Sequence, residues 1–530
     1  MSFDLTSGEE PVGNERTLSG DISENVLSND PALAAIQNFH GKYPKQLWSL
    51  FFSEMWERFC FYGMRGMLTF FMISHLMMTE KVANLQYGAT QAFVYAFTFI
   101  GGLFADKILG FRKSLFWGGL LMITGSCILA YDPVRFFFLG ISFNIIGTGF
   151  FKPNISTMVG KLYKEGDART DAGFSLFYAG INLGALLGGY FCIAIGKGDF
   201  MGATIPEHLR WNIAFGLAAI VMTISLVTFV FTKKQLGPIG LAPQHGVGKE
   251  KQRSLLTYAV YAGSLLVIPL IMIMVSKTEY TDYFMYTVGP LVMIYIFYEM
   301  YRCTPIERSK LWAALVFIAF SIVFWAFYEQ SGGSLSIFAA KHLDHKVLGL
   351  TLDPNGVNNS ANSVFVIILA TVVGLGWIWL NQRKLEPNTL VKFGLGFIFL
   401  SGGFFIFYYT RFLANAQGIT SLNVFTLAWF VITFGELCLS PIGLSIMTKL
   451  SPQRLSGVMM GMWFLASAYG QYAAGILGAG MAPVDDHSSS ISQLISYTSG
   501  YRQLAIYALI AGVVLILISP LVRKLMHEVK

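Results

Sequence analysis

The sequence predicts an all-α protein that crosses the membrane fourteen times, as two six-helix bundles plus two extra helices. Three observations predict this fold class. Hydrophobic residues make up 54% of the chain and charged residues only 13%, whereas a soluble domain carries roughly 25% charged residues. Apolar runs of about 20 residues, the length that spans a bilayer, recur along the chain. Lysine and arginine gather in alternate connections between these runs, as the positive-inside rule requires.

The apolar runs fall into groups of six, two and six. We expect spans at 46–77, 84–108, 113–131, 134–160, 171–196, 211–232, 254–276, 281–301, 309–338, 361–382, 389–411, 421–449, 455–481 and 500–522. This grouping predicts a flexible cytoplasmic tail at 1–45, an N-terminal six-helix bundle at 46–233, linkers with an inserted helix pair at 234–308, and a C-terminal bundle with a short tail at 309–530.

The distribution of cations predicts the orientation of the chain. The connections that begin the inside set carry Arg112, Lys164 and Lys234, whereas the opposite connections carry only scattered cations. Because the cation-rich side of a membrane protein faces the cytoplasm, both termini are expected there. The sequence therefore predicts a multi-pass protein of the inner cell membrane, surrounded by lipid.

Several function classes are disfavoured by composition and motif. The net charge of +7 fits the positive-inside pattern, and there is no basic stretch with interleaved aromatics that would indicate nucleic-acid binding. The five cysteines show no paired spacing, so neither disulfides nor a metal site is expected. Gly248-Lys249 resembles the end of a phosphate-binding loop, but Pro243 replaces the first glycine. We therefore expect no enzyme, no cofactor other than protons as coupling ions, and no obligate protein partner.

Ionisable residues within the predicted spans are the candidate functional groups, because a charge at the bilayer centre costs from about 2.5 to more than 10 kcal/mol. On a helix with about 100° per residue, the four in the first predicted span, at 46–77, fall on one face with Phe61 and Tyr62. That face must line a bundle interior or a wet cavity. The alternative is helix–helix salt bridging without transport. The seven residues are Glu54, Glu57, Arg58, Arg65, Lys152, Glu329 and Glu436.

The sum of these charges predicts proton coupling. Four acids stand against three bases, so a cavity that contained all seven would be one proton short of neutrality. The eight histidines all lie in tails, loops or span ends. Carboxylates rather than a histidine switch are therefore expected to carry any proton relay.

Six motifs resemble those of one transporter family. At these residues the chain is similar to the proton-coupled oligopeptide transporters, a branch of the major facilitator superfamily, and the inserted helix pair is typical of bacterial members. The motifs are Glu54-Met-Trp-Glu57-Arg58-Phe59-Cys60-Phe61-Tyr62-Gly63, Gly101 to Gly110, Phe151-Lys152-Pro153-Asn154, Phe174 to Leu186, Phe324-Trp325 with Glu329-Gln330, and Phe434-Gly435-Glu436-Leu437.

The resemblance implies a role for each matching position. Arg65 and Lys152 would hold the carboxylate of a peptide, and Glu436 would hold its ammonium group. Glu54, Glu57 and Arg58 would couple protonation to gating, with Glu329 assisting in the same cavity. Further residues would line the cavity or shape side-chain pockets, although plain aromatic packing is an alternative for Tyr95, Tyr178, Trp325 and Trp463. They are Tyr62, Tyr95, Tyr178, Asn182, Asn362, Trp325, Trp463 and Ser467.

One departure and two alternatives remain open. Phe61 stands where the family motif has its first tyrosine, so one hydroxyl is missing from the cavity. Fixed anchors of opposite charge favour two or three residues, because each residue spans at most about 3.3–3.6 Å. The function expected is import of di- and tripeptides with protons by alternating access. The alternatives are a symporter for another anion or metabolite such as nitrate, and a membrane sensor that transports nothing.

Overall fold

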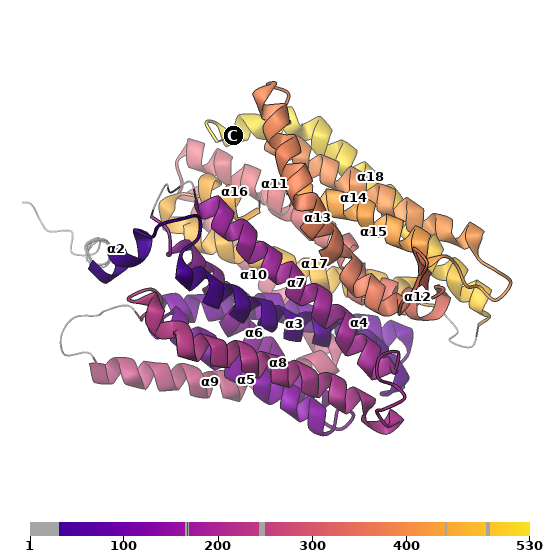
Figure 1. Ribbon diagram of the computed structural model, residues 1–530. Coiled ribbons are helices and arrows are strands. Elements are labelled where there is room, and N and C mark those ends of the chain that lie inside the picture. The colour runs from indigo at the N-terminus through magenta and orange to yellow at the C-terminus, as the bar shows by residue number, and fades with distance from the viewer. Residues whose placement is uncertain are drawn as a thin grey trace, which may run out of the picture.

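Long helices form almost the whole of the structure (Figure 1). The computed structural model describes residues 31–164, 167, 169–242, 250–439, 443–483 and 488–529. Within these ranges ten helical segments are long and apolar enough to cross a membrane. The remaining helices are compatible with the fourteen crossings predicted.

Six helices form the N-terminal bundle, which is indigo to magenta in Figure 1. Within it α3 packs against α7 and α8, and α5 packs against α6 and α8. The helices are α3 (Lys45–Ser74), α4 (Glu80–Phe104, continued by η1, Ala105–Leu109), α5 (Phe111–Tyr131), α6 (Phe137–Gly160), α7 (Thr170–Lys197) and α8 (Arg210–Thr232).

One helix of the C-terminal bundle is interrupted at η4 (Glu329–Gly332). Residues 440–442, between a helical part that ends at Leu439 and one that begins at Gly443, lie outside the described part of the chain. The elements are α11 (Pro305–Tyr328), α12 (Ser334–His342), α13 (Pro354–Gln382), α14 (Thr389–Tyr409), α15 (Leu422–Leu439), α16 (Gly443–Leu450), α17 (Ser456–Met481) and α18 (Ser490–Met526).

Local capping sets several helix starts in this bundle. Thr304 and Glu307 form a capping box before α11: the Glu307 N–H donates to the Thr304 hydroxyl at 3.4 Å, and the Thr304 N–H donates to the Glu307 carboxylate at 2.9 Å. Asp353 caps α13 by accepting from the Gly356 N–H at 2.6 Å, with Pro354 at the first helical position. As a result α13 begins seven residues before the predicted span at 361–382.

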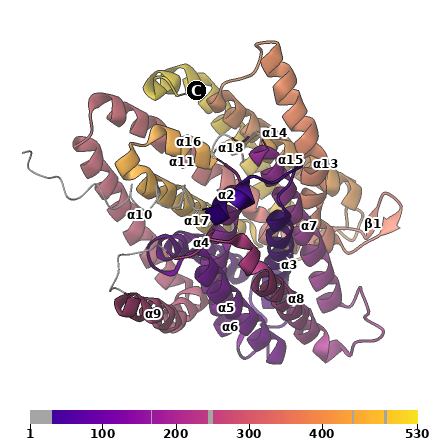
Figure 2. The same cartoon turned by 60° about the vertical axis from the view of Figure 1, so that its left-hand side comes forward.

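The inserted pair contacts both bundles. α9 (Glu250–Ser276) packs against α6 and α4, and α10 (Thr278–Tyr301) packs against α4 and α11. In Figure 2 α9 lies beside α5 and α6, and α10 lies on the side of α11 and α17. Hydrogen bonds tie α10 to α17: Tyr472 donates to Asp282 at 2.5 Å, and Tyr469 donates to the Met285 carbonyl.

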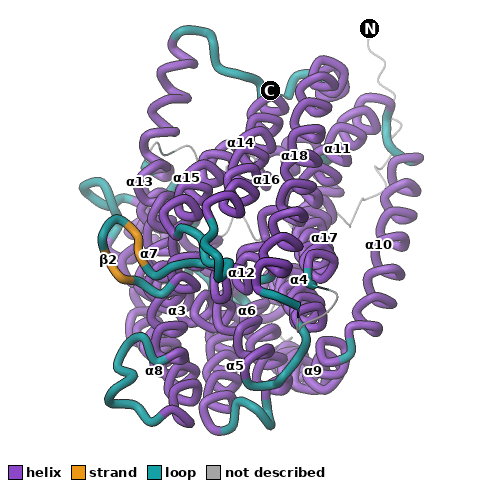
Figure 3. Tube along the Cα trace, turned by 90° about the vertical axis from the view of Figure 1, so that its right-hand side faces the viewer, coloured by secondary structure: helices purple, strands orange, loops and turns teal. Residues whose placement is uncertain are grey.

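The connections contain little regular structure. A hairpin of β1 (Lys346–Val347) and β2 (Leu350–Thr351) lies between α12 and α13, in a region predicted only as a loop (Figure 3). Residues 31–37 of the predicted tail form a short helix, α2 (Pro31–Gln37). Residues 1–30 lie outside the described part of the chain.

The two bundles meet along α4–α17 and α7–α13. Glycines allow the first of these contacts: a Cβ on Gly88 would lie 2.7 Å from the Cα of Gly475. In Figure 1 α2 and the C-terminus lie at one end of the molecule, and α12 lies at the other. We call these the terminal end and the α12 end.

Candidate functional site

One guanidinium lies between two carboxylates inside the N-terminal bundle. Arg58 Nε is 2.9 Å from Glu54 Oε1 and 2.5 Å from Glu57 Oε2. All three side chains are buried, with Glu57 fully shielded from solvent. One turn of α3 separates Glu54 from Arg58, so the helix itself brings them together. Because one cation faces two acids, this group is balanced only when a second positive charge or a proton is added.

Lys152 is the candidate for that second positive charge. It lies in α6, and it interacts electrostatically with both Glu54 and Glu57. Its ammonium is 4.3 Å from the centre of the Tyr95 ring and 5.7 Å from that of Phe61. No carboxylate of the described residues pairs with Lys152 within 4 Å. Its ammonium thus faces two aromatic rings and has no direct ion-pair partner there.

Arg65 joins the two bundles. Its Nη2 forms an ion pair with Glu329 Oε2 and donates to Ser331 Oγ at 2.9 Å. Its Nε donates to the Tyr87 hydroxyl at 2.7 Å. The break between α11 and α12 places Glu329 and Ser331 in η4, and the Thr69 hydroxyl donates to the Gly332 carbonyl in the same turn. The irregular backbone at η4 therefore forms one of the places where α3 meets the C-terminal bundle, beside α12 and α13.

The carboxylate of Glu436 is hydrogen-bonded through one of its oxygens, Oε2. Tyr328 Oη and Asn362 Nδ2 each donate to its Oε2 at 2.7 Å. Asn362 also donates to Thr433 Oγ1 at 3.2 Å. Among the described residues, Oε1 of Glu436 accepts no hydrogen bond and no cation pairs with the carboxylate. A carboxylate oxygen without a donor, in a side chain that is otherwise buried, is suited to receive a positive group from a ligand.

The remaining predicted site residues have mixed surroundings. Asn182 donates to the Tyr178 carbonyl at 2.9 Å, and Ser467 donates to the Trp463 carbonyl at 3.3 Å, so both amide and hydroxyl bond within their own helices. Trp325 is half-buried, and its Nε1 has no partner among the described residues. The side chain of Tyr62 lies beneath the Arg65 guanidinium, 5.7 Å from it.

The structure groups the predicted residues into three clusters. The first contains Glu54, Glu57 and Arg58 with Lys152 nearby; the second is Arg65 with Glu329; the third is Glu436 with Asn362. Arg65 and Lys152, which the resemblance assigns jointly to one carboxylate, have different neighbours here. The role of each in substrate binding stays a prediction.

Three residues in these clusters were missed by the sequence analysis. Tyr87 and Ser331 bond to Arg65, and Tyr328 bonds to Glu436. A neutral hydroxyl carries no charge penalty in an apolar run, so intramembrane charge gives no indication of these three residues. Tyr328 and Ser331 flank Glu329, and this proximity was the one available signal.

Two further ion pairs join the bundles at the α12 end. Lys197, at the end of α7, pairs with Asp353, which caps α13. Lys341 in α12 pairs with Glu80 at the start of α4, and the Tyr497 hydroxyl of α18 donates to the same carboxylate. Within the described ranges no ion pair joins the two bundles at the terminal end. Among the described residues, the charged connections between bundles are therefore confined to the middle and to the α12 end.

A polytopic protein with ionisable groups from two bundles meeting between them has the features of a secondary transporter, in which two halves move around a central site. The sequence pattern of the POT family matches residues 112–492. The chain belongs to the POT family.

Similar proteins cover nearly the whole chain. The uncharacterized transporter YclF of Bacillus subtilis is 31% identical over 520 residues, covering 96% of this chain and 99% of YclF. Peptide transporter YePEPT of Yersinia enterocolitica is 31% identical over 509 residues, covering 92% of this chain and 96% of its own length. The crystal structure of the peptide transporter POT in complex with sulfate is 33% identical with a TM-score of 0.79, and covers 95% of this chain and 99% of that one.

Proposed function

We propose that this chain is a proton-coupled symporter that imports di- and tripeptides by alternating access. One observation carries the proposal: cations on the N-terminal bundle (Arg65, Lys152) and an acid on the C-terminal bundle (Glu436) offer opposite charges from the two halves. A short peptide is a zwitterion that carries opposite charges at its ends. It would therefore bring the two bundles together when bound, which a simple anion such as nitrate would not do.

The relatives support the substrate class. YePEPT is named a peptide transporter, and proteins from Aeromonas hydrophila and Pectobacterium carotovorum are named dipeptide and tripeptide permeases. A structure of a similar POT family transporter contains 5-aminolevulinic acid. Fixed anchors would limit the length of the peptide, since each added residue extends a chain by about 3.3–3.6 Å.

The proton site is proposed at the Glu54–Glu57–Arg58 cluster, with Glu329 as its counterpart across the interface. Protonation of one carboxylate would leave the guanidinium with a single acid and would neutralise the buried charge before the bundles move. Protons would be the only coupling ion, and no cofactor or catalytic reaction is assigned.

Orientation completes the proposal. The protein would lie in the inner cell membrane with its terminal end facing the cytoplasm, in accordance with the excess of lysine and arginine at that end. The ion pairs Lys197–Asp353 and Lys341–Glu80 would then close the outer side in this conformation.

The experiment is uptake of a labelled dipeptide by liposomes that contain the purified protein. An inward proton gradient should concentrate the dipeptide, and dissipating the gradient should abolish accumulation while exchange continues. Equal uptake in protein-free liposomes would overturn the proposal of transport. Accumulation of nitrate instead of the dipeptide would favour an anion symporter.

A further inference from the structure

The carboxylate of Glu436 has a second donor that no motif indicates. Tyr328 is the last residue of α11, and its hydroxyl donates to Glu436 Oε2 at 2.7 Å from a helix 108 positions earlier in the chain. Both residues are buried, with 8% of Tyr328 and 9% of Glu436 exposed. A tyrosine hydroxyl that donates to a carboxylate makes a charge-assisted hydrogen bond, which is stronger than one between neutral groups.

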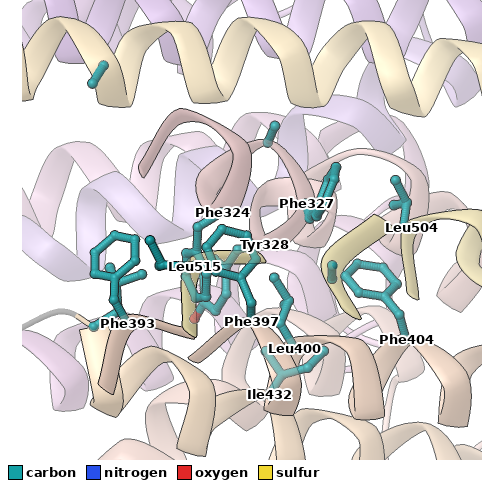
Figure 4. Packing of buried hydrophobic residues seen from close by; sticks show 14 of the residues in the cluster. Phe324, Phe327, Tyr328, Phe393, Phe397, Leu400, Phe404, Ile432, Leu504 and Leu515 are labelled. Atoms are coloured by element: carbon teal, nitrogen blue, oxygen red, sulfur yellow. The ribbon is translucent and has the colours of Figure 1, made fainter. Parts of the chain in front are cut away.

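Aromatic packing fixes the Tyr328 ring, so the direction of its hydroxyl is also fixed. Phe324 stacks on the ring at 5.9 Å between centroids with 17° between planes, as Figure 4 shows from nearby. Trp325 and Trp429 contact it edge-on at 5.3 Å and 6.2 Å. A side chain held on three sides loses little further conformational entropy when its hydroxyl forms a hydrogen bond.

The donors are arranged on one oxygen only. Asn362 and Tyr328 both donate to Oε2, and together they leave Oε1 of Glu436 without a donor from the described residues. A carboxylate has four acceptor sites on its two oxygens. The two donors thus fix the plane of the carboxylate and direct its unused oxygen towards whatever cation enters the site.

We propose that Tyr328 is the positioning residue for the amino-end anchor: it orients Glu436 so that Oε1 receives the ammonium group of the substrate. The inference rests on the proposed function, because it assigns a partner to the acid that binds the peptide amine. Tyr328 does not touch the substrate and acts through Glu436. Tyr328 also precedes Glu329, the partner of Arg65, so the amine site and the ion pair between the bundles are attached to consecutive residues.

The test uses Tyr328→Phe, which removes the hydroxyl and keeps the ring in its aromatic packing. Tyr469→Phe is the matched control, because its hydroxyl bonds to the Met285 carbonyl of α10 and no role in the site is assigned to it. For each purified variant, binding of one dipeptide is measured with a free amino terminus and with that terminus acetylated. The ratio of the two affinities cancels differences in the amount of folded protein.

We expect Tyr328→Phe to weaken binding of the free dipeptide about 10-fold, since a hydrogen bond to a charged group is worth roughly that factor. Binding of the acetylated peptide should change less than about 2-fold on the same physical argument. Tyr469→Phe should leave the ratio unchanged. In a Glu436→Gln background, Tyr328→Phe should have no further effect on the ratio, because the charge that the hydroxyl positions is gone.

Three contrary outcomes are distinguishable. If the parent prefers the free amine and Tyr328→Phe retains the full preference, the positioning role is wrong and the proposed function stands. If the parent itself binds free and acetylated peptides equally, the proposed amine site fails and this inference fails with it. An equal loss for both peptides in Tyr328→Phe would show a structural role for the hydroxyl and would also overturn the inference.

Discussion

Arg65 of α3 and Glu329 of η4 form a buried ion pair that connects the two helix bundles across 264 positions of sequence. Only 12% of the Arg65 side chain and 3% of the Glu329 side chain are exposed. The guanidinium also donates to Tyr87 and Ser331, so its hydrogen-bonding capacity is largely used by the protein. For Arg65 to bind a peptide carboxylate, as the family resemblance implies, it must first give up part of this arrangement.

This ion pair distinguishes Arg65 from Lys152, the other cation that the resemblance assigns to the peptide carboxylate. Lys152→Ala should weaken binding of a dipeptide with a free carboxylate much more than binding of its C-terminal amide, because Lys152 has no ion-pair partner in the described chain. Arg65→Ala should impair transport of both peptides, because it also leaves Glu329 buried without its partner. Competition binding with the acid and amide forms measures the Lys152→Ala effect, and liposome uptake of both forms measures the Arg65→Ala effect. Equal losses for acid and amide in Lys152→Ala would mean that this lysine serves structure alone.

Glu436→Gln should abolish the preference for peptides with a free amino terminus. The substitution keeps the size of the side chain and removes the negative charge, and losing one member of a buried ion pair typically costs about 3–5 kcal/mol. Binding of N-acetylated peptides should fall far less. Isothermal titration with matched free and acetylated dipeptides measures the difference, and parallel losses would contradict the assignment of Glu436 to the amine.

Glu57→Gln should uncouple uptake from the proton gradient. Glu57 is fully buried, and its Oε2 is 2.5 Å from the single guanidinium that it shares with Glu54. A neutral amide at this position mimics the protonated acid, so exchange should continue while accumulation stops. Counterflow and gradient-driven accumulation are compared in the same liposomes.

Glu54→Gln and Glu329→Gln serve as companion variants, because coupled carboxylates share a proton and the site cannot be assigned from one substitution. Accumulation like that of the parent in Glu57→Gln would move the proton site to one of these two residues. Normal accumulation in all three variants would contradict a carboxylate relay.

The ion pair between Lys197 and Asp353, at the α12 end, should behave as a buried salt bridge. Asp353 is 3% exposed, so Lys197→Met leaves a buried charge unpaired and should destabilise the conformation described here by about 3–5 kcal/mol. Asp353→Asn should cost less, because an asparagine can still accept from the Gly356 N–H as a helix cap. Thermal unfolding in detergent measures each variant.

The double variant Lys197→Met/Asp353→Asn provides the control for that pair. Removing both charges should recover part of the stability lost in Lys197→Met, since no charge is then left unpaired. Strictly additive losses would indicate that the two residues do not interact in the protein as purified. A change in transport rate without a change in stability would instead place the pair in gating.

Hydropathy and charge in the sequence determined most of the fold. The apolar runs located most helices to within a few residues, but α13 begins seven and α18 ten residues before the predicted spans at 361–382 and 500–522. The grouping into six, two and six is compatible with the helices described. Some errors were avoidable from local signals. Asp353-Pro354 is a strong helix start that moves α13 to an earlier residue than predicted, and the glycines after Glu329 indicate the break between α11 and α12.

The candidate site, like the fold, was predictable from the sequence only in part. Glu54, Glu57 and Arg58 lie within one turn of a single helix, so helical geometry alone predicted that they would meet. The pairing of Arg65 with Glu329, and of Tyr328 with Glu436, was decided only by the tertiary structure. These partners lie on different helices, and sequence spacing carries no information about the rotation of one helix relative to another. A hydroxyl in an apolar run also leaves no trace in charge or hydropathy, so its partner becomes visible only when the helices are packed.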